Sequence, residues 1–331
     1  MEIKKLSAPF SEEEIQKHWK YTDKVYISCV CITFNQSGYI RDAIDGFLAQ
    51  KTDYRFEIVI HDDVSTDGTR DILLEYKRKY PSIIKLILQD KNQFQLGFKI
   101  IPIAISHSCG DYIALCEGDD YWIRSDKIDN QYKTLIRSKK DLAFTRVIEK
   151  KKGLYRYSQY LYNNSNITPD EIIKNGGNAC ATCSIMISRA AFDSLPKWVL
   201  TAPVLDLYLQ AYCSIYSNGA IYDSSCYSVY RLESAGSWTN SNVKSILKSY
   251  DFLNELEKSY IKFNNDTKGI YKKSINTTLG MSYLNLAFLA LKKCNCILFI
   301  RCLYVSFDKL KLEFPHELYR LLIRVIFRER R

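Results

Sequence analysis

The residues best suited to chemistry in this sequence form an acidic cluster, Glu117-Gly118-Asp119-Asp120, followed by Tyr-Trp. Three carboxylates within four residues repel one another, and a bound cation would neutralise them. Carboxylate oxygens suit Mg²⁺ or Mn²⁺, ions that can also bridge the oxygens of a diphosphate. The acids could instead cap the next helix, but one cap needs one side chain. The cluster therefore predicts a divalent-metal site.

A second polar loop runs from Asp62 to Thr69 with the sequence DDVSTDGT. Asp67 and Thr69 are of the residue types that cap helices, and they are expected to cap the helix that begins near Arg70. Asp62 and Asp63 come too early for capping and lie directly at a strand end. A carboxylate there can accept hydrogen bonds from a nucleobase or from ribose hydroxyls. The loop therefore indicates either a helix cap alone or a nucleoside site.

Short apolar runs predict strands, and apolar residues at helical spacing predict helices between them. The expected strands are 26–33, 56–61, 83–88 and 112–116, and the expected helices are 40–50, 70–80 and 100–108. Farther along, the pattern indicates strands at 183–187 and 220–230 and a helix at 205–216. This alternation predicts an α/β fold with a mainly parallel sheet flanked by helices, in which ligands bind beyond the carboxyl ends of the strands. The loops TFNQ, DDVSTDGT and EGDDYW should therefore share one crevice.

The three motifs CITFNQ, EIVIHDDVSTDGT and GDYIALCEGDDYW, in this order, resemble the family 2 glycosyltransferases of the bacterial surface-polysaccharide type. The match spans roughly residues 26–122, and a weaker one continues to Trp238. The resemblance implies the Rossmann-like fold called GT-A, a nucleotide-sugar donor, with a UDP-sugar expected first, and a divalent metal. By motif position, the residues expected to contact the donor are Thr33, Asn35, Asp62, Asp63, Lys99, Glu117 and Asp119. The metal ligands that the resemblance implies are Asp119, Asp120 and Glu233.

Two departures from the family pattern affect the metal site. Glu117 occupies the first acidic position, where aspartate is usual, so metal contact is assigned to Asp119 and Asp120 rather than to Glu117. Family members also often carry a "YRxH" segment, whose histidine can join the metal. This chain has Tyr-Arg-Leu-Glu there, so Glu233 replaces the histidine and could either bind the cation or pair with Arg231.

A candidate general base follows from the same resemblance. The segment 202–209 (APVLDLYL) is similar to one that carries a catalytic carboxylate in inverting members of the family, and Asp206 is its only acid. Apolar neighbours raise the pKa of such a carboxyl towards a useful range. The alternative is a partly buried, hydrogen-bonded aspartate without a catalytic role.

Charge is distributed unevenly along the chain. The formal net charge is +10, and the 17 lysine and arginine residues against 8 acidic residues after position 240 account for +9 of it. The helix expected at 316–331 carries an arginine stripe, so it could lie on anionic lipid or dock its apolar face on the protein. No secretory signal or membrane span is expected, which indicates a cytoplasmic protein, with or without peripheral contact to the inner face of the cell membrane.

These features together predict an inverting glycosyltransferase that moves a sugar to a hydroxyl of a surface glycan or lipid-linked saccharide, with no nucleic-acid partner. The expected domains are a helical lead-in (1–24), a catalytic domain (25–238) with nucleotide-binding (25–122) and acceptor (123–238) halves, and a basic helical C-terminal region (239–331). Two alternatives stay open. A nucleotidyltransferase acting on sugar phosphates should carry a glycine-rich basic loop after the first strand, where this chain has FNQSGYI, and a basic nucleic-acid-binding protein should bind in a salt-dependent way.

Overall fold

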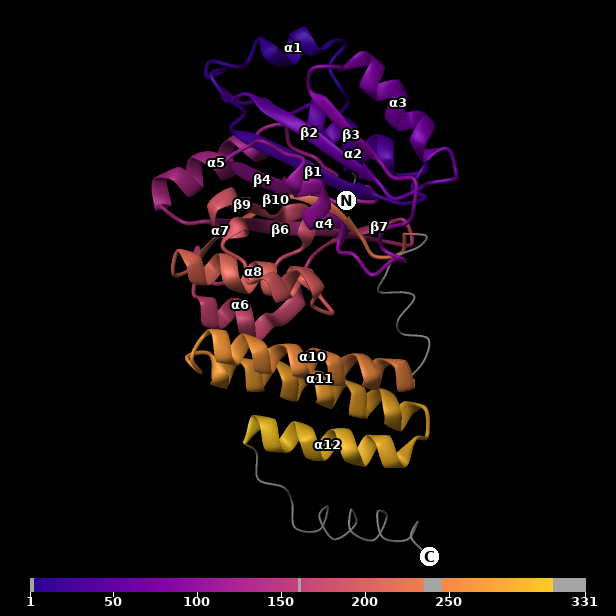
Figure 1. Cartoon of the computed structure of the whole chain (residues 1–331), viewed down its shortest axis with the longest axis vertical. Coiled ribbons are helices and arrows are strands. Elements are labelled where there is room, and N and C mark those ends of the chain that lie inside the picture. Colours follow the sequence, from indigo (N-terminus) through magenta and orange to yellow (C-terminus); the bar gives the residue numbers. More distant parts are fainter. Residues whose placement is uncertain (1–2, 160–161, 235–245, 312–331) are drawn as a thin grey trace, which may run out of the picture. The chain divides into compact units, whose positions relative to one another are not determined.

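The computed structural model describes residues 3–159, 162–234 and 246–311, which form two compact units (Figure 1). The first unit contains the sheet and its flanking helices. The second contains three long helices together with the short segments Ile173–Gly176 and Ala202–Val204. The expected domain boundary near residue 238 and the expected helix at 316–331 lie outside the described residues.

Four parallel strands form the first half of the sheet, in the order β3-β2-β1-β4. They are β1 (Ile27–Thr33), β2 (Phe56–Asp62), β3 (Ile84–Leu88) and β4 (Tyr112–Leu115). The helices between them are α2 (Ile40–Leu48), α3 (Thr69–Lys79) and α4 (Ile100–Ser106), and a short α1 (Glu12–Gln16) precedes the sheet. Each of these four strands, and each of the helices α2, α3 and α4, begins and ends within two residues of its predicted position. The apolar periodicity of this half was therefore sufficient to locate its elements.

The second half of the sheet is mixed. Strand β9 (Met186–Ser188) is antiparallel to β4 on one side and to β6 (Leu142–Lys151) on the other, and β10 (Ala220–Arg231) is parallel to β6. Shorter strands complete the sheet: β5 (Tyr121–Trp122), β7 (Leu154–Tyr157) and β8 (Asn166–Ile167). The helices here are α5 (Lys127–Ser138), α6 (Pro169–Asn175), α7 (Arg189–Asp193) and α8 (Leu205–Tyr216).

The sequence predictions for this second half were uneven. The helix at 205–216 is confirmed, and the strand at 220–230 is longer by one residue. The predicted start of the strand at 183–187 was wrong, because Thr182–Ser184 forms a 3-10 turn and the strand begins at Met186. Helix α5 and strand β6 were not predicted, although Ile128, Tyr132 and Leu135 have helical spacing and are buried on one side of α5.

Alternate residues of the central strands supply two separate apolar layers. On β1, Ile27, Cys29 and Cys31 pack with side chains of α2 and α5, whereas Val30 packs with side chains of α4 and α8. Successive side chains of a strand point to opposite faces, so a continuous apolar run covers both faces of a buried strand. The acidic cluster and the other two polar motif loops of this half therefore lie at the ends of largely apolar strands.

The second unit is built from α10 (Ile246–Asp266), α11 (Lys272–Lys292) and α12 (Cys296–Leu310). Helices α11 and α12 pack closely: the Ser306 hydroxyl donates to the Gly280 carbonyl at 2.8 Å, and a Cβ on Gly280 would meet the Leu310 side chain at 2.6 Å. Lys309 forms an ion pair with Glu257 of α10 at 2.5 Å. Among the described residues, no helix has the length and apolar character that crossing a membrane requires.

Candidate active site

The sheet brings the first and third polar loops together at its carboxyl edge. Beyond β4, the Gly118 amide donates to the Ile32 carbonyl of β1 at 2.9 Å. A Cβ on Gly118 would lie 2.5 Å from Gln36 Oε1 and 3.0 Å from the Thr33 Cβ, so only glycine permits this approach. The Thr33 hydroxyl donates to Gln36 Oε1 at 2.8 Å and supports the same loop. The glycine of the acidic cluster therefore sets how closely the cluster packs on the loop after β1.

The three carboxylates of the acidic cluster converge. Ligand oxygens of Glu117, Asp119 and Asp120 all lie within 4.8 Å of one another. Burial, followed by the charges of Asp119 and Asp206, raises the pKa of Glu117 to about 8. Burial and the two neighbouring carboxylates also raise the pKa of Asp120 well above its ordinary range, and the hydrogen bond from the Arg231 backbone amide opposes that rise. Without a cation, the site therefore favours protonated acids.

Asp120 is the most buried of the three acids, with 1% of its surface exposed. Its Oδ1 accepts a hydrogen bond from the Arg231 amide at 2.8 Å. Its Oδ2 is buried and has no hydrogen-bond partner within the described part of the chain. A buried carboxylate oxygen without a donor is costly, and a bound cation would satisfy it.

Arg231, at the end of β10, binds the acidic loop through hydrogen bonds. Its guanidinium pairs with Asp42 of α2, donates to the Asp119 carbonyl, and lies 4.4 Å from the ring centre of Tyr121. Lys5 reaches the same Asp42 carboxylate at 2.8 Å. The Tyr-Arg-Leu-Glu segment left open a pair between Arg231 and Glu233, but the partner of Arg231 is Asp42. No sequence signal identifies that contact, because the two residues are far apart in the chain.

Replacing Arg231 with methionine is expected to lower the free energy of unfolding by about 1–3 kcal/mol, because the change leaves the Asp119 carbonyl without its donor and leaves Asp42 with Lys5 alone. Urea titration of the whole chain measures this loss. The matched control is Arg124→Met, since Arg124 also pairs with a carboxylate and lies over a tyrosine ring, but its side chain is 45% exposed. The control should cost about 1 kcal/mol or less. Equal losses in the two variants would contradict the structural role given to Arg231.

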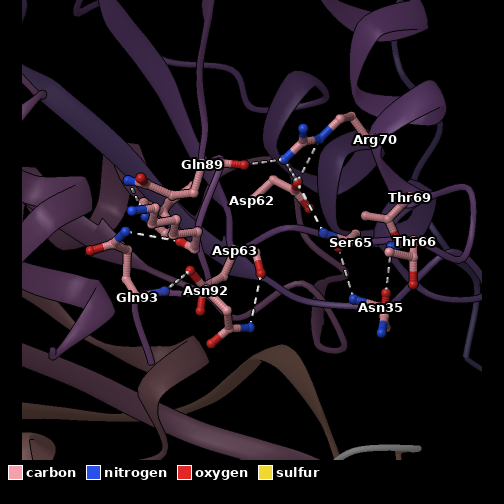
Figure 2. Close-up of polar contacts among 12 residues, drawn as sticks. Asn35, Asp62, Asp63, Ser65, Thr66, Thr69, Arg70, Gln89, Asn92 and Gln93 are labelled. Atoms are coloured by element: carbon pink, nitrogen blue, oxygen red, sulfur yellow. Dashed lines mark hydrogen bonds and ion pairs between the residues drawn. The ribbon is translucent and has the colours of Figure 1, made fainter. Parts of the chain in front are cut away.

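The loops after β1 and β2 are joined by reciprocal hydrogen bonds (Figure 2). The Asn35 amide donates to the Ser65 hydroxyl at 2.8 Å, and the Asn35 side chain accepts from the Thr66 amide at 2.8 Å. Asn35 adopts a left-handed backbone conformation, with φ at 52°, which asparagine tolerates better than most residues. These contacts place the two loops side by side, and the shared crevice stays a prediction.

The capping prediction needs a correction. The residue at the N-cap of α3 is Gly68, with φ at 93°, rather than Asp67 or Thr69. Asp67 instead accepts from the Thr69 amide at 3.0 Å and from the Ser37 amide at 2.9 Å. Although burial acts in the opposite direction, these hydrogen bonds and that of the Thr69 hydroxyl lower the pKa of Asp67 to about 2. Asp67 therefore stays ionised and supports the turn.

Asp62 and Asp63 are both buried, but their side chains differ in what they contact (Figure 2). Asp62 Oδ2 accepts from Arg70 at 2.8 and 2.9 Å, and its Oδ1 has no partner among the described residues. Asp63 accepts from the backbone amides of Gln93 at 2.7 Å and Phe94 at 3.0 Å. Asp63 thus organises the loop between β3 and α4, and the free oxygen of Asp62 is the more available acceptor.

Asp206 lies in the first turn of α8, where its Oδ1 accepts from the Leu207 amide at 2.9 Å. Burial raises the pKa of Asp206, and the Lys99 cation opposes that rise. Burial likewise lowers the pKa of Lys99, which forms the N-cap of α4. Since the charge of Asp206 also raises the pKa of Glu117, the structure brings Glu117, Asp206 and Lys99 into one electrostatic environment.

Glu233 lies apart from this group. Its carboxylate accepts from the Lys152 amide at 3.2 Å and pairs with Lys151 at 3.9 Å, in the turn between β6 and β7. Within the described ranges, the group of side chains that could hold a metal contains Glu117, Asp119 and Asp120 and does not include Glu233. Ser234, which no motif predicts, donates from its hydroxyl to Asp119 Oδ2.

The parallel β3-β2-β1-β4 sheet, the antiparallel β9 and the acidic loop after β4 together match the fold of GT-A glycosyltransferases. The chain is similar to the S. aureus TarS fragment 1–349 solved with UDP-GlcNAc, with a TM-score of 0.53, 14% identity, and coverage of 86% of this chain and 89% of that one. It is also similar to the mannosyltransferase PcManGT of Pyrobaculum calidifontis, solved with GDP-Man and Mn²⁺, with a TM-score of 0.51, 13% identity, and coverage of 90% and 92%. These likenesses establish the fold.

The sequence relatives establish the family. The model for glycosyl transferase family 2 matches residues 28–195, just over half of the chain, and the chain belongs to this family. An uncharacterized protein of Mycobacterium tuberculosis is 45% identical over 112 residues, which cover 34% of this chain and 32% of that protein. The chain therefore aligns with about a third of that relative's length.

Two relatives carry descriptions that name a pathway or a substrate. The putative teichuronic acid biosynthesis glycosyltransferase TuaG of Bacillus subtilis is 27% identical, over 50% of this chain and 63% of TuaG. The Escherichia coli UDP-Glc:alpha-D-GlcNAc-diphosphoundecaprenol beta-1,3-glucosyltransferase WfaP is 26% identical, over 54% of this chain and 65% of WfaP. Membership of the family favours a glycosyltransferase over the nucleotidyltransferase and nucleic-acid-binding alternatives.

Proposed function

We propose that the protein is a metal-dependent, inverting glycosyltransferase that transfers a sugar from a nucleotide-sugar to a hydroxyl of a surface glycan or lipid-linked saccharide. The observation that carries this proposal is the convergence of three carboxylates within 4.8 Å at the end of β4. The charge of Asp206 raises the pKa of Glu117, one of the three. The descriptions of TuaG and WfaP support the acceptor class, and those of TarS and WfaP support a UDP-sugar as the donor to test first.

The residues of the acidic cluster fit a divalent metal. Their oxygens are hard ligands of the kind that Mg²⁺ and Mn²⁺ bind, and the unpartnered Asp120 Oδ2 needs a positive partner. Asp119 and Asp120 would hold the ion, with Glu117 beside them, and Glu233 stays a prediction from family resemblance alone. A bound divalent ion would offset the charge of the leaving diphosphate.

The other predicted residues have separate tasks in this proposal. Thr33, Asn35 and the free oxygen of Asp62 form the nucleoside side of the donor site, and Asp63 shapes that side by holding the loop at Gln93 and Phe94. Lys99 adds a positive charge towards the donor phosphates. The loops therefore divide into a nucleoside wall after β1 and β2 and a diphosphate wall after β4.

Asp206 acts as the general base in this proposal. As the acceptor oxygen attacks C1 of the donor sugar, the hydroxyl proton passes to the Asp206 carboxylate, a new C1–O bond forms, and the bond from C1 to the diphosphate oxygen breaks. Attack opposite the leaving group inverts the configuration at C1. Burial raises the pKa of Asp206, which makes its carboxylate a stronger base than an exposed aspartate.

A thermal-shift panel of UDP-, GDP- and dTDP-sugars, each with and without Mn²⁺, tests the proposal directly. One nucleotide-sugar is expected to raise the melting temperature only when the metal is present, because ligand binding to the native state stabilises it. The same panel without sugar donors controls for stabilisation by the metal alone. If no nucleotide-sugar stabilises the protein in a metal-dependent way, the proposed function is wrong.

The pKa of Glu117 makes a separate prediction about metal removal. Without divalent cations, the free energy of unfolding is expected to fall as pH rises from the ordinary value of 4.5 to about 8, because the native state keeps a proton that the unfolded chain has released. Mn²⁺ binds ionised carboxylates, so its stabilising effect should grow over the same range. Urea titrations at about pH 5 and about pH 8 measure both effects, and Glu117→Gln should weaken the pH dependence. Equal Mn²⁺ stabilisation at both pH values would contradict this prediction.

The membrane contact is also part of the proposal. Its support is the excess of basic residues after position 240, since anionic lipid attracts such segments. Flotation of the protein with vesicles of anionic and of neutral lipid tests it. Binding to anionic vesicles that weakens with salt is expected, and equal flotation with both lipids would remove the electrostatic argument.

A further inference from the structure

A cavity of about 120 Å³ lies between β6, β10 and residues 177–182, within the first unit. Its wall includes Phe144, Arg146, Glu149, Tyr162, Asp206 and Tyr222. The cavity adjoins the candidate active site, because Asp206 forms part of both. Of the site residues predicted from the sequence, Asp206 alone is among those that line this cavity.

Tyr222 lines this cavity and has an unsatisfied hydroxyl. The residue is 5% exposed, and its hydroxyl is buried with no hydrogen-bond partner among the described residues. The rings of Phe144 and Tyr162 lie 5.4 and 5.2 Å from the Tyr222 ring, so the hydroxyl stands among aromatic groups. A buried hydroxyl without a partner costs free energy, and a ligand atom that accepts a hydrogen bond from it would remove that cost.

Arg146 supplies a positive charge to the same cavity. Its Nε and Nη2 donate to the Ser158 carbonyl at 3.1 and 2.9 Å, and its guanidinium lies 4.7 Å from the ring centre of Tyr157. No carboxylate in the described part of the chain lies within ion-pair distance of Arg146. The other acid on this side, Glu149, is paired with Arg156 at 2.7 Å. The charge of Arg146 is therefore not neutralised by the protein.

Arg146 and Tyr222 both line this cavity. Burial raises the pKa of Tyr222, and the Arg146 cation opposes that rise. The two groups form no hydrogen bond with each other, since the hydroxyl has no partner.

We propose that this cavity binds an anionic group of the acceptor saccharide, a carboxylate or a phosphate, through the Tyr222 hydroxyl and the Arg146 guanidinium. That this saccharide is the acceptor rests on the function proposed above. Charge-assisted hydrogen bonds to arginine are among the stronger polar contacts, and the aromatic wall suits the apolar face of a sugar ring. Because Asp206 borders the cavity, an anchored acidic sugar residue would bring a neighbouring hydroxyl to the proposed base.

Three probes that differ only at C6 of glucose test this subsite: methyl β-glucoside, methyl β-glucuronide and methyl β-glucoside 6-phosphate. Calorimetric titration of the whole chain is expected to show that a charged probe binds about tenfold or more tightly than the glucoside. The glucuronide and phosphate titrations distinguish the two anions. Equal binding of all three probes, or no binding of either charged probe, would overturn the proposal.

The variants Arg146→Gln and Tyr222→Phe should each bring the affinity for the charged probe close to that for the glucoside. The matched control is Tyr157→Phe, which keeps the ring beside Arg146 and removes a hydroxyl that does not line the cavity. Discrimination that survives both cavity variants would overturn the proposal. Thermal melts of all variants separate loss of binding from loss of folding.

The donor panel described above is run on the same protein, so that the two proposals can fail separately. Metal-dependent donor binding without discrimination among the three probes would overturn the anionic subsite alone. Discrimination without any donor binding would overturn the glycosyltransferase proposal and leave the anionic subsite in place.

Discussion

Asp206→Asn is expected to lower the turnover number of sugar transfer by about 10²–10⁴-fold, the range that general-base catalysis contributes. The amide has the shape of the carboxylate and can still accept from the Leu207 amide, so the helix start should be kept. The amide cannot take the proton of the acceptor hydroxyl. Donor affinity, measured by titration with the nucleotide-sugar and Mn²⁺, should change little. A large loss of turnover with intact donor binding is the signature of the base.

Asp170→Asn is the matched control for this variant. Asp170 also lies in the first turn of a helix, α6, but it is exposed and does not line the cavity beside Asp206. The control should retain near wild-type turnover. If Asp206→Asn keeps turnover within a factor of about three of the control, a general base at this position is excluded, because such bases contribute at least about 10²-fold.

Asp119→Asn is expected to lower kcat/KM by about 10³-fold and to abolish the metal-dependent part of donor binding, since metal ions contribute several kcal/mol of charge stabilisation. The substitution removes one of three converging charges. It should also raise the Mn²⁺ concentration needed for half-maximal activity. The folded structure should persist, because the Ser234 hydroxyl can still donate to the remaining side-chain oxygen.

The control for this second variant is Asp90→Asn, an exposed aspartate after β3 whose loss removes the same charge from the surface. Metal dependence of donor binding, activity at saturating Mn²⁺ and thermal stability are measured for both variants. An Asp119→Asn protein that still binds donor in a metal-dependent way with wild-type affinity would contradict the assignment of Asp119 as a metal ligand.

How far the sequence predicts the fold depends on the kind of element. The apolar runs of β1, β2, β3 and β4 located their strands to within two residues, because a strand buried on both faces is apolar throughout. Strand β6 escaped prediction because polar and basic residues such as Thr145, Arg146 and Lys150 interrupt its apolar pattern. Several of these interruptions are the groups that line the cavity. Thr145 and Arg146 thus both interrupt the apolar pattern of the strand and line the cavity.

The candidate site shows the same division. The motifs located the acidic cluster and the two other loops at strand ends, and the structure places these loops in contact. The motifs assigned Asp62 and Asp63 to one role, whereas their hydrogen bonds differ, with Arg70 on one and the amides of Gln93 and Phe94 on the other. A residue type at a motif position does not specify which of its oxygens remain free.

The sequence by itself determined the family, the succession of strands and helices in the parallel half of the sheet, and the acidic cluster with its glycine. Local periodicity and motif spacing carry that information. Only the tertiary structure decided that Arg231 holds the acidic loop, that Asp206 shares an electrostatic environment with Glu117, and that Arg146 and Tyr222 line one cavity. The physical reason is that these contacts join strands and helices distant in the chain. Their pairing depends on sheet order and register, such as the antiparallel β9 between β4 and β6, which hydrophobic periodicity does not encode.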